Sequence, residues 1–253
     1  MKFAICQVSV SPLRVEASDR SEMVTQILFG EKVEIIETQK NWLKLKADFD
    51  GYEGWADEKQ FMEVSEAEYS SIRIDKFASE SFNLAVEHET PLTLPMASTL
   101  PNLINNKLKF GHKEIEYLGE FQSGNSSKSD LPNIAMMYLN TPYLWGGKSV
   151  FGIDCSGMVQ QVYKFCGIQL PRDAHQQAEI GEALSFVEEA EPGDLAFFDN
   201  TEGKIIHVGI ILEGNKIIHA HGKVRIDPID ITGIFNTDSQ TYSHKLRVIK
   251  KIL

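Results

Sequence analysis

The fold of the second half of the chain is decided by residues 152–167, which read GIDCSGMVQQVYKFCG. Cys155 stands where a loop becomes a helix, Asp154 is a favoured N-cap residue, and Gly167 is a typical C-terminal stop. We therefore predict a helix over residues 155–166. Apolar, strand-like runs follow at 195–198, 205–212, 216–220 and 246–252. A helix followed by an antiparallel sheet predicts an α+β fold.

The position of Cys155 at the helix start suits a nucleophile. The thiolate is the reactive form of cysteine, and the N–H groups and dipole of a helix N-terminus stabilise it. We expect the pKa of this thiol to fall from its usual value of about 8.5. Position alone does not separate a reactive cysteine from a small buried one. Cys166, near the far end of the helix, and Cys6, in an apolar run, are expected in the core.

Two histidines supply the base that such a cysteine needs. An imidazole must hold the thiol proton, and a further group must orient that imidazole. His207 lies within the strand-like run 205–212, and His219 lies on the next strand. A three-residue loop at 213–215 places His219 opposite Gly209, diagonal to His207 on one face of the sheet. A two-residue loop would put the two histidines on opposite faces.

The first half of the chain favours short strands. Those expected in residues 1–63 are Phe3–Val10, Lys32–Thr38, Trp42–Ala47 and Glu53–Ala56. This region resembles the bacterial SH3 domains, whose tryptophan strands match Trp42 and Trp55. Residues 64–125 are interpreted as a second, divergent SH3-like module or as a strand-rich extension. Residues 126–253 form the last expected domain.

The composition excludes several classes of partner. The net charge is −11, and residues 1–125 carry 21 acidic against 13 basic side chains. Such a surface is unsuited to nucleic acid but could favour a cationic ligand. Three cysteines make no disulfide framework, and no signal peptide or 18-residue apolar stretch is visible. We therefore expect a cytoplasmic protein that does not bind membranes. We also expect it to be a monomer.

Six motifs occur in the order of one known family. They are Tyr143-Leu144-Trp145-Gly146-Gly147, Gly152-Ile153-Asp154-Cys155-Ser156-Gly157, Leu170-Pro171-Arg172, Pro192-Gly193-Asp194-Leu195, His207-Val208-Gly209-Ile210 and Ile218-His219-Ala220. Over residues 130–253 the chain resembles the NlpC-type peptidases, papain-like enzymes that cut bacterial cell-wall peptides. The resemblance implies that Cys155 is the nucleophile, His207 the base and later acid, and His219 the orienting residue. His221 stands where relatives often have a small residue, and it could compete with His219.

The SH3-like region in front narrows the resemblance to one subgroup, the γ-D-glutamyl-L-diamino acid endopeptidases that recycle free murein peptides. The resemblance implies a substrate L-Ala-γ-D-Glu-L-diamino acid with a free amino terminus, the diamino acid being lysine or diaminopimelate. The residues that it implies for gripping the alanine ammonium are Tyr143, Asp154 and Ser156 of the last domain, and Glu16 and Tyr52 of the first.

Some residues and functions stay open. Arg172 and Asp173 could be surface charges or could bind a substrate carboxylate. Cys155, His207, His219 and His221 are residue types that bind zinc, but no accompanying zinc motif occurs, so we predict no metal and no cofactor. The alternative functions are a general cell-wall hydrolase, an amidase or acyltransferase on the same fold, and a non-catalytic wall-binding protein.

Overall fold

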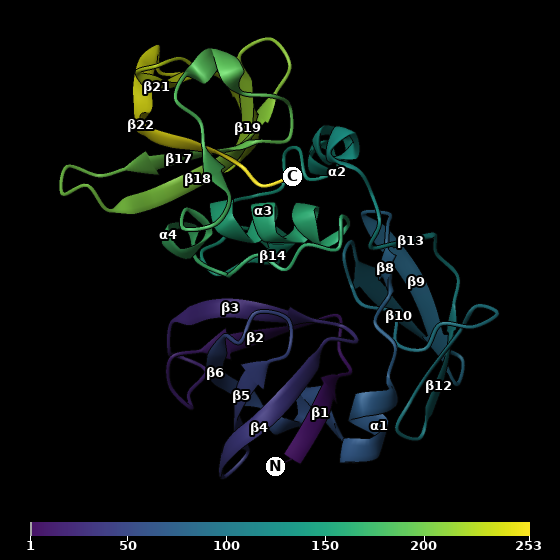
Figure 1. Cartoon of the computed structure of the whole chain (residues 1–253). Helices are drawn as coiled ribbons and strands as arrows, with labels where there is room; N and C mark the ends of the chain where they lie inside the picture. Colours follow the sequence, from purple (N-terminus) through teal and green to yellow (C-terminus); the bar gives the residue numbers. More distant parts are fainter. Residues whose placement is uncertain (1) are drawn as a thin grey trace. The chain divides into compact units, whose positions relative to one another are not determined.

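The structure is a computed structural model that describes residues 2–253 (Figure 1). The chain divides into two compact units. The first comprises the described residues up to Asn125 together with Trp145–Phe151, and the second comprises Ser126–Leu144 and Gly152–Leu253. Within residues 2–253, no helix combines the length and apolarity that a membrane crossing requires.

The first unit begins with a seven-stranded antiparallel sheet. Its strands are β1 (Lys2–Cys6), β2 (Val10–Arg14), β3 (Met23–Leu28), β4 (Lys32–Gln39), β5 (Trp42–Ala47), β6 (Glu53–Asp57) and β7 (Phe61–Val64), with the 3-10 turn η1 (Glu58–Gln60). They lie in the order β3-β2-β6-β5-β4-β1-β7. Three of the four expected strands are confirmed as β4, β5 and β6.

The expectation of one strand over Phe3–Val10 is wrong. β1 ends at Cys6 and β2 starts at Val10 because the chain changes partners there. β1 pairs with β4 and β7, whereas β2 pairs with β3. β3 was not predicted, because the polar residues Thr25 and Gln26, which are buried, interrupt its apolar pattern.

Residues 64–125, the second part of the first unit, are rich in strands, as expected. Its elements are α1 (Glu66–Ser71), β8 (Lys76–Ala78), β9 (Phe82–Glu87), β10 (Thr90–Pro95), β11 (Lys107–Phe110), β12 (Lys113–Tyr117) and β13 (Phe121–Ser123). Four of them form a sheet in the order β10-β9-β12-β11, and β8 pairs with β13. The SH3-like character of this part stays a prediction.

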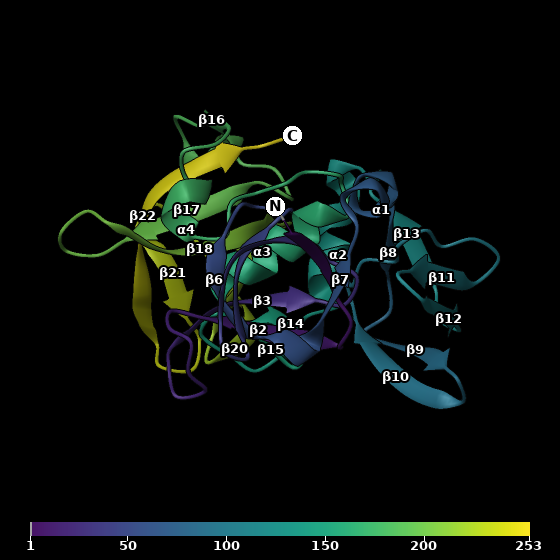
Figure 2. The same cartoon turned by 90° about the horizontal axis from the view of Figure 1, so that it is seen from below.

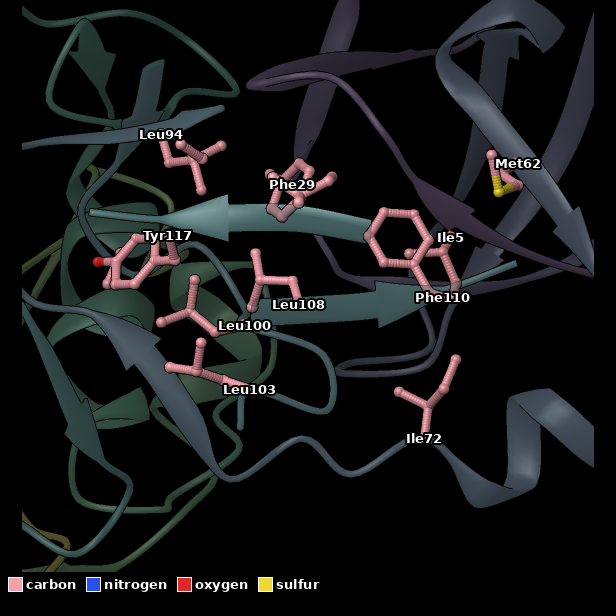
Figure 3. Packing of buried hydrophobic residues seen from close by; sticks show 13 residues of the cluster. Ile5, Phe29, Met62, Ile72, Leu94, Leu100, Leu103, Leu108, Phe110 and Tyr117 are labelled. Atoms are coloured by element: carbon pink, nitrogen blue, oxygen red, sulfur yellow. The ribbon is translucent and has the colours of Figure 1, made fainter. Parts of the chain in front are cut away.

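One hydrophobic cluster joins the two parts of the first unit (Figure 3). Ile5, Phe29 and Met62 come from the first sheet region, whereas Leu108 and Phe110 come from β11. The rings of Phe29 and Phe110 meet edge to face with centroids 5.8 Å apart. Apolar burial of this kind is the main stabilising contribution to a small domain. Residues 2–63 and 64–125 therefore share a core.

Residues Trp145–Phe151 are built into the first unit, although their neighbours on both sides belong to the second. The Trp145 indole Nε1 donates a hydrogen bond to Glu22 Oε1 at 2.7 Å. The ammonium of the buried Lys148 lies 3.5 Å from Glu31 Oε2. This segment was predicted to lie in the last domain, because no local pattern distinguishes it from the residues around it.

The second unit is α+β, as predicted. Its elements are η2 (Lys128–Asp130), α2 (Leu131–Met136), β15 (Gly152–Ile153), α3 (Cys155–Lys164), α4 (Ala174–Gln177), β16 (Glu182–Ala183), η3 (Val187–Glu189), β17 (Leu195–Asp199), β18 (Ile205–Leu212), β19 (Lys216–His221), β20 (Lys223–Pro228), β21 (Gly233–Asn236) and β22 (Thr241–Lys251); the short β14 (Lys148–Ser149) belongs to the first unit. The sheet order is β16-β22-β17-β18-β19-β20, and β21 pairs with β22. Helix α3 packs against β18 and β19 (Figure 1 and Figure 2).

Candidate active site

Cys155 is the first residue of α3, as predicted, and its side chain is buried. Asp154 is the N-cap: it has extended backbone angles, and its Oδ1 accepts a hydrogen bond from Gly157 N at 2.7 Å. Gly152 is required nearby, because a Cβ there would lie 2.7 Å from the side chain of Leu144. The capped helix start therefore holds the thiol at a defined point.

The expected low pKa of the thiol is not what the structure supports. Burial raises the pKa of Cys155 to about 12, and the neighbouring Asp154 carboxylate adds to the rise. The N–H groups of Val208 and Ser156 and the Arg172 guanidinium act in the opposite direction but are outweighed. Desolvation disfavours the thiolate more strongly than the helix dipole stabilises it. Cys155 is therefore a neutral thiol in the free protein.

His207 and His219 meet across the β18–β19 hairpin. The predicted register is confirmed: Gly209 pairs with His219 and Leu212 pairs with Lys216, around a loop at 213–215. His207 Nε2 lies 2.9 Å from His219 Nδ1. A Cβ at Gly209 would lie 2.9 Å from the Cβ of His219, so only glycine leaves room opposite that histidine.

The other predicted partner, His221, is the exposed last residue of β19. Its ring lies nearly parallel to that of His219 with centroids 6.2 Å apart. His244, from β22, instead lies parallel to the His207 ring at 4.0 Å. His244 was not predicted, because nothing near residue 244 in the sequence indicates that its ring reaches His207.

His219 has a second partner, Asp227, which was not predicted from the sequence. Its Nε2 lies 3.0 Å from Asp227 Oδ2, and both side chains are fully buried. Asp227 belongs to β20, which pairs with β19. The pattern of residues 223–228 gives no signal of this, since Asp227 falls on the polar phase of the alternation with Lys223 and Arg225.

Asp154 is already paired within its own unit. Arg172 donates from Nη1 to Asp154 Oδ1 at 2.9 Å and from Nη2 to Oδ2 at 2.6 Å. Arg172 Nη1 also donates to Ser156 Oγ at 2.9 Å. Arg172 is only 2% exposed, so its interpretation as a surface charge is wrong. Asp173 is the N-cap of α4, and its N–H donates to Gln176 Oε1 at 3.3 Å.

Tyr143 lies beside the ion pair of Asp154 and Arg172. Its N–H donates to Gly222 O at 3.0 Å, and its backbone forms an isolated parallel β-bridge with Ile153. Partial burial raises the pKa of Tyr143 to about 12, with further contributions from the nearby Cys155 and Asp154. Tyr143, Asp154 and Ser156 are therefore brought together around Cys155. The Tyr143 hydroxyl is protonated at neutral pH and able to donate.

Glu16 and Tyr52 lie in the first unit. Glu16 is in the exposed turn between β2 and β3, where its N–H donates to Ser21 Oγ at 2.9 Å. Tyr52 follows the turn after β5, and its N–H donates to Asp50 Oδ1 at 3.0 Å. Their part in substrate binding stays a prediction.

Among residues 2–253, one group of possible metal ligands lies close together, formed by His207, His219 and His244 with ligand atoms within 4.8 Å of one another. The 2.9 Å separation between the ring nitrogens of His207 and His219 is a hydrogen-bond length, whereas two nitrogens on one tetrahedral zinc lie roughly 3.3 Å apart. The geometry thus favours direct hydrogen bonding between the rings.

The three clustered histidines predict loss of stability in acid. Burial lowers the pKa of His207 well below 6.5, lowers that of His219, and lowers that of His244 to about 4. The pKa of a histidine in the unfolded chain is about 6.5. Between the lowered native pKa values and pH 6.5 the unfolded chain binds more protons than the native protein. The free energy of unfolding therefore falls as the pH falls. Urea titrations at pH 7.5 and pH 5.0 should reveal uptake of up to about three protons on unfolding.

His244→Phe is the matched variant, since it keeps the stacked ring but cannot take up a proton. It should lower the proton uptake by about one. An unfolding free energy independent of pH over this range would contradict the assignment of three neutral imidazoles in this cluster.

The motifs agree with family models. Residues 140–243 match the NlpC/P60 family, and residues 13–61 match the bacterial dipeptidyl-peptidase Sh3 domain. The chain is 31% identical over 212 residues to gamma-D-glutamyl-L-lysine dipeptidyl-peptidase of Bacillus subtilis, covering 78% of this chain and 71% of the relative. It is 25% identical over 258 residues to dipeptidyl-peptidase 6 of Lysinibacillus sphaericus, covering 90% and 92% of the two chains.

The fold also has a counterpart of the same size. A crystal structure of an NlpC/P60 family protein from Bacillus cereus matches with a TM-score of 0.83 and 23% identity over 99% of both chains. The predicted papain-like α+β fold with an SH3-like domain in front is therefore confirmed. A buried cysteine at a helix start and two hydrogen-bonded histidines lie within the part that the family model matches. The chain belongs to the NlpC/P60 family and is one of its cysteine peptidases.

Proposed function

We propose that this NlpC/P60 cysteine peptidase hydrolyses the γ-D-glutamyl-L-diamino acid bond of free murein stem peptides. The observation that supports this most strongly is the similarity, over most of the chain, to relatives named gamma-D-glutamyl-L-lysine dipeptidyl-peptidase. The proposed setting is peptide recycling in the cytoplasm. Three unpaired cysteines among residues 2–253 are compatible with a reducing compartment.

In the proposed mechanism, Cys155 is the nucleophile and His207 the base. The sulfur bonds to the γ-carbonyl carbon of D-glutamate while its proton passes to His207. The bond to the diamino acid nitrogen then breaks, and His207 returns the proton to the leaving amine. Water attacks the thioester, His207 takes a water proton and restores it to the sulfur, and the glutamate carboxylate is released.

The electrostatics of the free protein favour proton transfer during attack. Burial raises the pKa of Cys155 and lowers the pKa of His207, so both groups are neutral before substrate binds. The ion pair of thiolate and imidazolium is then formed only as the sulfur approaches the carbonyl. A neutral His207 is the form that can accept the proton.

The selectivity for a free amino terminus is proposed to come from charge. Tyr143, Asp154 and Ser156 lie beside the nucleophile, and Glu16 and Tyr52 are the proposed contributors of the SH3-like domain. Arg172 already neutralises much of the Asp154 charge. Among the described residues no ion pair engages the Glu16 carboxylate, so Glu16 is the free negative charge of the proposed set.

The test compares L-Ala-γ-D-Glu-L-Lys with its N-acetyl form. Each charge-assisted hydrogen bond contributes about 1.5–3 kcal/mol, so losing two should lower kcat/KM roughly a hundredfold or more. Acetylation should cost far more than exchanging lysine for diaminopimelate. Mass spectrometry of the products gives the cleaved bond.

Glu16→Gln should narrow the difference between the free and acetylated peptides. Glu37→Gln, an exposed glutamate on β4 of the same sheet, is the matched control and should leave the difference unchanged. Equal kcat/KM on both peptides with the unaltered protein would replace this function by that of a general cell-wall hydrolase.

A further inference from the structure

The two histidines are the middle of a longer series of hydrogen bonds that ends on Asp227. His207 Nε2 lies 2.9 Å from His219 Nδ1, and His219 Nε2 lies 3.0 Å from Asp227 Oδ2. His219 and Asp227 are fully buried, and His207 is 5% exposed. Water is therefore excluded from both contacts, and the three ring nitrogens that form them are bonded within the protein.

Asp227 is held in one orientation by residues other than histidine. Arg225 donates from Nε to Oδ2 at 2.6 Å and from Nη2 to Oδ1 at 2.9 Å. Thr237 donates to Oδ1 from its N–H at 3.3 Å and from its hydroxyl at 3.2 Å. Burial alone would raise the pKa of Asp227, but the hydrogen bonds from His219, Arg225 and Thr237 hold it below its usual range.

An ionised carboxylate can only accept hydrogen bonds, and this decides where each ring proton lies. Since Asp227 accepts, His219 carries its proton on Nε2. In a neutral ring Nδ1 of His219 then has the lone pair, so His207 must donate from Nε2. The remaining nitrogen of His207, Nδ1, is left as the acceptor.

This assignment of the ring protons requires that both imidazoles are neutral, and both are. Burial lowers the pKa of His207 and of His219, the latter in spite of the opposing effect of Asp227. The thiol of Cys155 lies at the N–H of Val208, the residue after His207. The buried carboxylate of Asp227, two hydrogen bonds away from His207, thus determines which nitrogen of the His207 ring is free to accept a proton.

We propose that Asp227, clamped by Arg225, is a positioning residue that sets the tautomers of His219 and His207 and leaves His207 Nδ1 as the base. This inference rests on the proposed roles of Cys155 and His207. Asp227 touches neither substrate nor nucleophile in this scheme. It acts through His219, whose ring transmits the choice of tautomer.

The decisive variant is Asp227→Asn. An amide offers one acceptor oxygen in place of two, and the donors of Arg225 and Thr237 compete for it. The NH2 group then faces His219 Nε2, which must accept, so the His219 proton moves to Nδ1. His207 Nε2 must accept in turn, and its proton moves to the nitrogen that the nucleophile needs.

Nitrogen-15 NMR of the full chain reads these tautomers without any substrate. In the unaltered protein we expect Nε2–H on both His207 and His219, and in Asp227→Asn we expect Nδ1–H on both. kcat should fall by about 10–100-fold with KM little changed, less than the roughly 10⁴-fold loss known when a carboxylate next to a catalytic base is made an amide.

Asp238→Asn is the matched control. Asp238 accepts from the same guanidinium, at 2.7 Å from Arg225 Nη1, but its side chain is 77% exposed and it does not contact His219. Its variant should keep both tautomers and change kcat by less than about twofold. Equal losses in the two variants would mean that Asp227 only supports Arg225, and the proposal would be wrong.

The spectrum of the unaltered protein tests the proposal even if Asp227→Asn does not fold. Nδ1–H on His207 or His219 in that spectrum would overturn it directly. A protein that failed to cleave the free stem peptide would contradict the proposed substrate alone, because the ring protons are read without substrate.

Discussion

Replacing Cys155 by alanine or serine should abolish peptide hydrolysis while the protein stays folded. Loss of the nucleophile removes the covalent step, and comparable losses in other hydrolases reach about 10⁶ in kcat. Alanine and serine are both tolerated at the first turn of a helix, so the melting temperature should change by only a few degrees. Product formation followed by mass spectrometry and thermal unfolding measure the two effects.

Cys166→Ser is the control within the same helix region. Cys166 lies just beyond the C-terminal end of α3, where its thiol donates to Ser127 O at 3.6 Å. The expectation that Cys166 lies in the core is wrong, because its side chain is only partly buried. Serine can make the same hydrogen bond, so activity should stay within about twofold. Retained turnover in Cys155→Ala with loss in Cys166→Ser would show that the nucleophile is misassigned.

His207→Ala should be nearly as damaging as loss of the thiol, by a factor of about 10⁵ to 10⁶ in kcat. The imidazole accepts the proton of a thiol whose pKa is raised to about 12 by burial, so water cannot replace it at neutral pH. The pKa of His207 lies well below 6.5. The acidic limb of kcat/KM against pH should therefore fall below pH 6.5, because the rate is lost only when the base becomes protonated.

His219→Ala should be less damaging than His207→Ala, because an orienting residue does not itself move the proton. His221→Ala is the matched histidine control, since His221 is exposed and its ring is stacked 6.2 Å from that of His219. It should retain activity within about threefold. A larger loss of kcat in His221→Ala than in His219→Ala would transfer the orienting role to His221 and contradict the contact between His207 and His219.

The sequence by itself determined the local elements that carry the site. The cap residue Asp154 predicts where α3 begins, and Gly167 predicts where the helix stops. The parity of β18 and β19 around a three-residue loop predicts that His207 and His219 share a face. These features depend on residues that are near neighbours along the chain, so composition and periodicity are enough to find them.

Only the tertiary structure decided which distant groups surround those residues. Arg172 is eighteen residues from Asp154, and His244 is on a strand that reaches His207 only through the sheet order. Trp145–Phe151 belongs to the first unit because Lys148 and Trp145 find their partners there, which no local pattern encodes.

Burial likewise could not be predicted from the sequence, and it reversed the expectation of a low pKa for Cys155. A helix N-terminus stabilises a thiolate, but the pKa of Cys155 is raised because the same thiol is desolvated and lies beside Asp154. Strand alternation also could not show that Asp227 would be enclosed by Arg225, Thr237 and His219. Solvent exclusion and long-range hydrogen bonds exist only once the strands have packed, and they decide the protonation of this site.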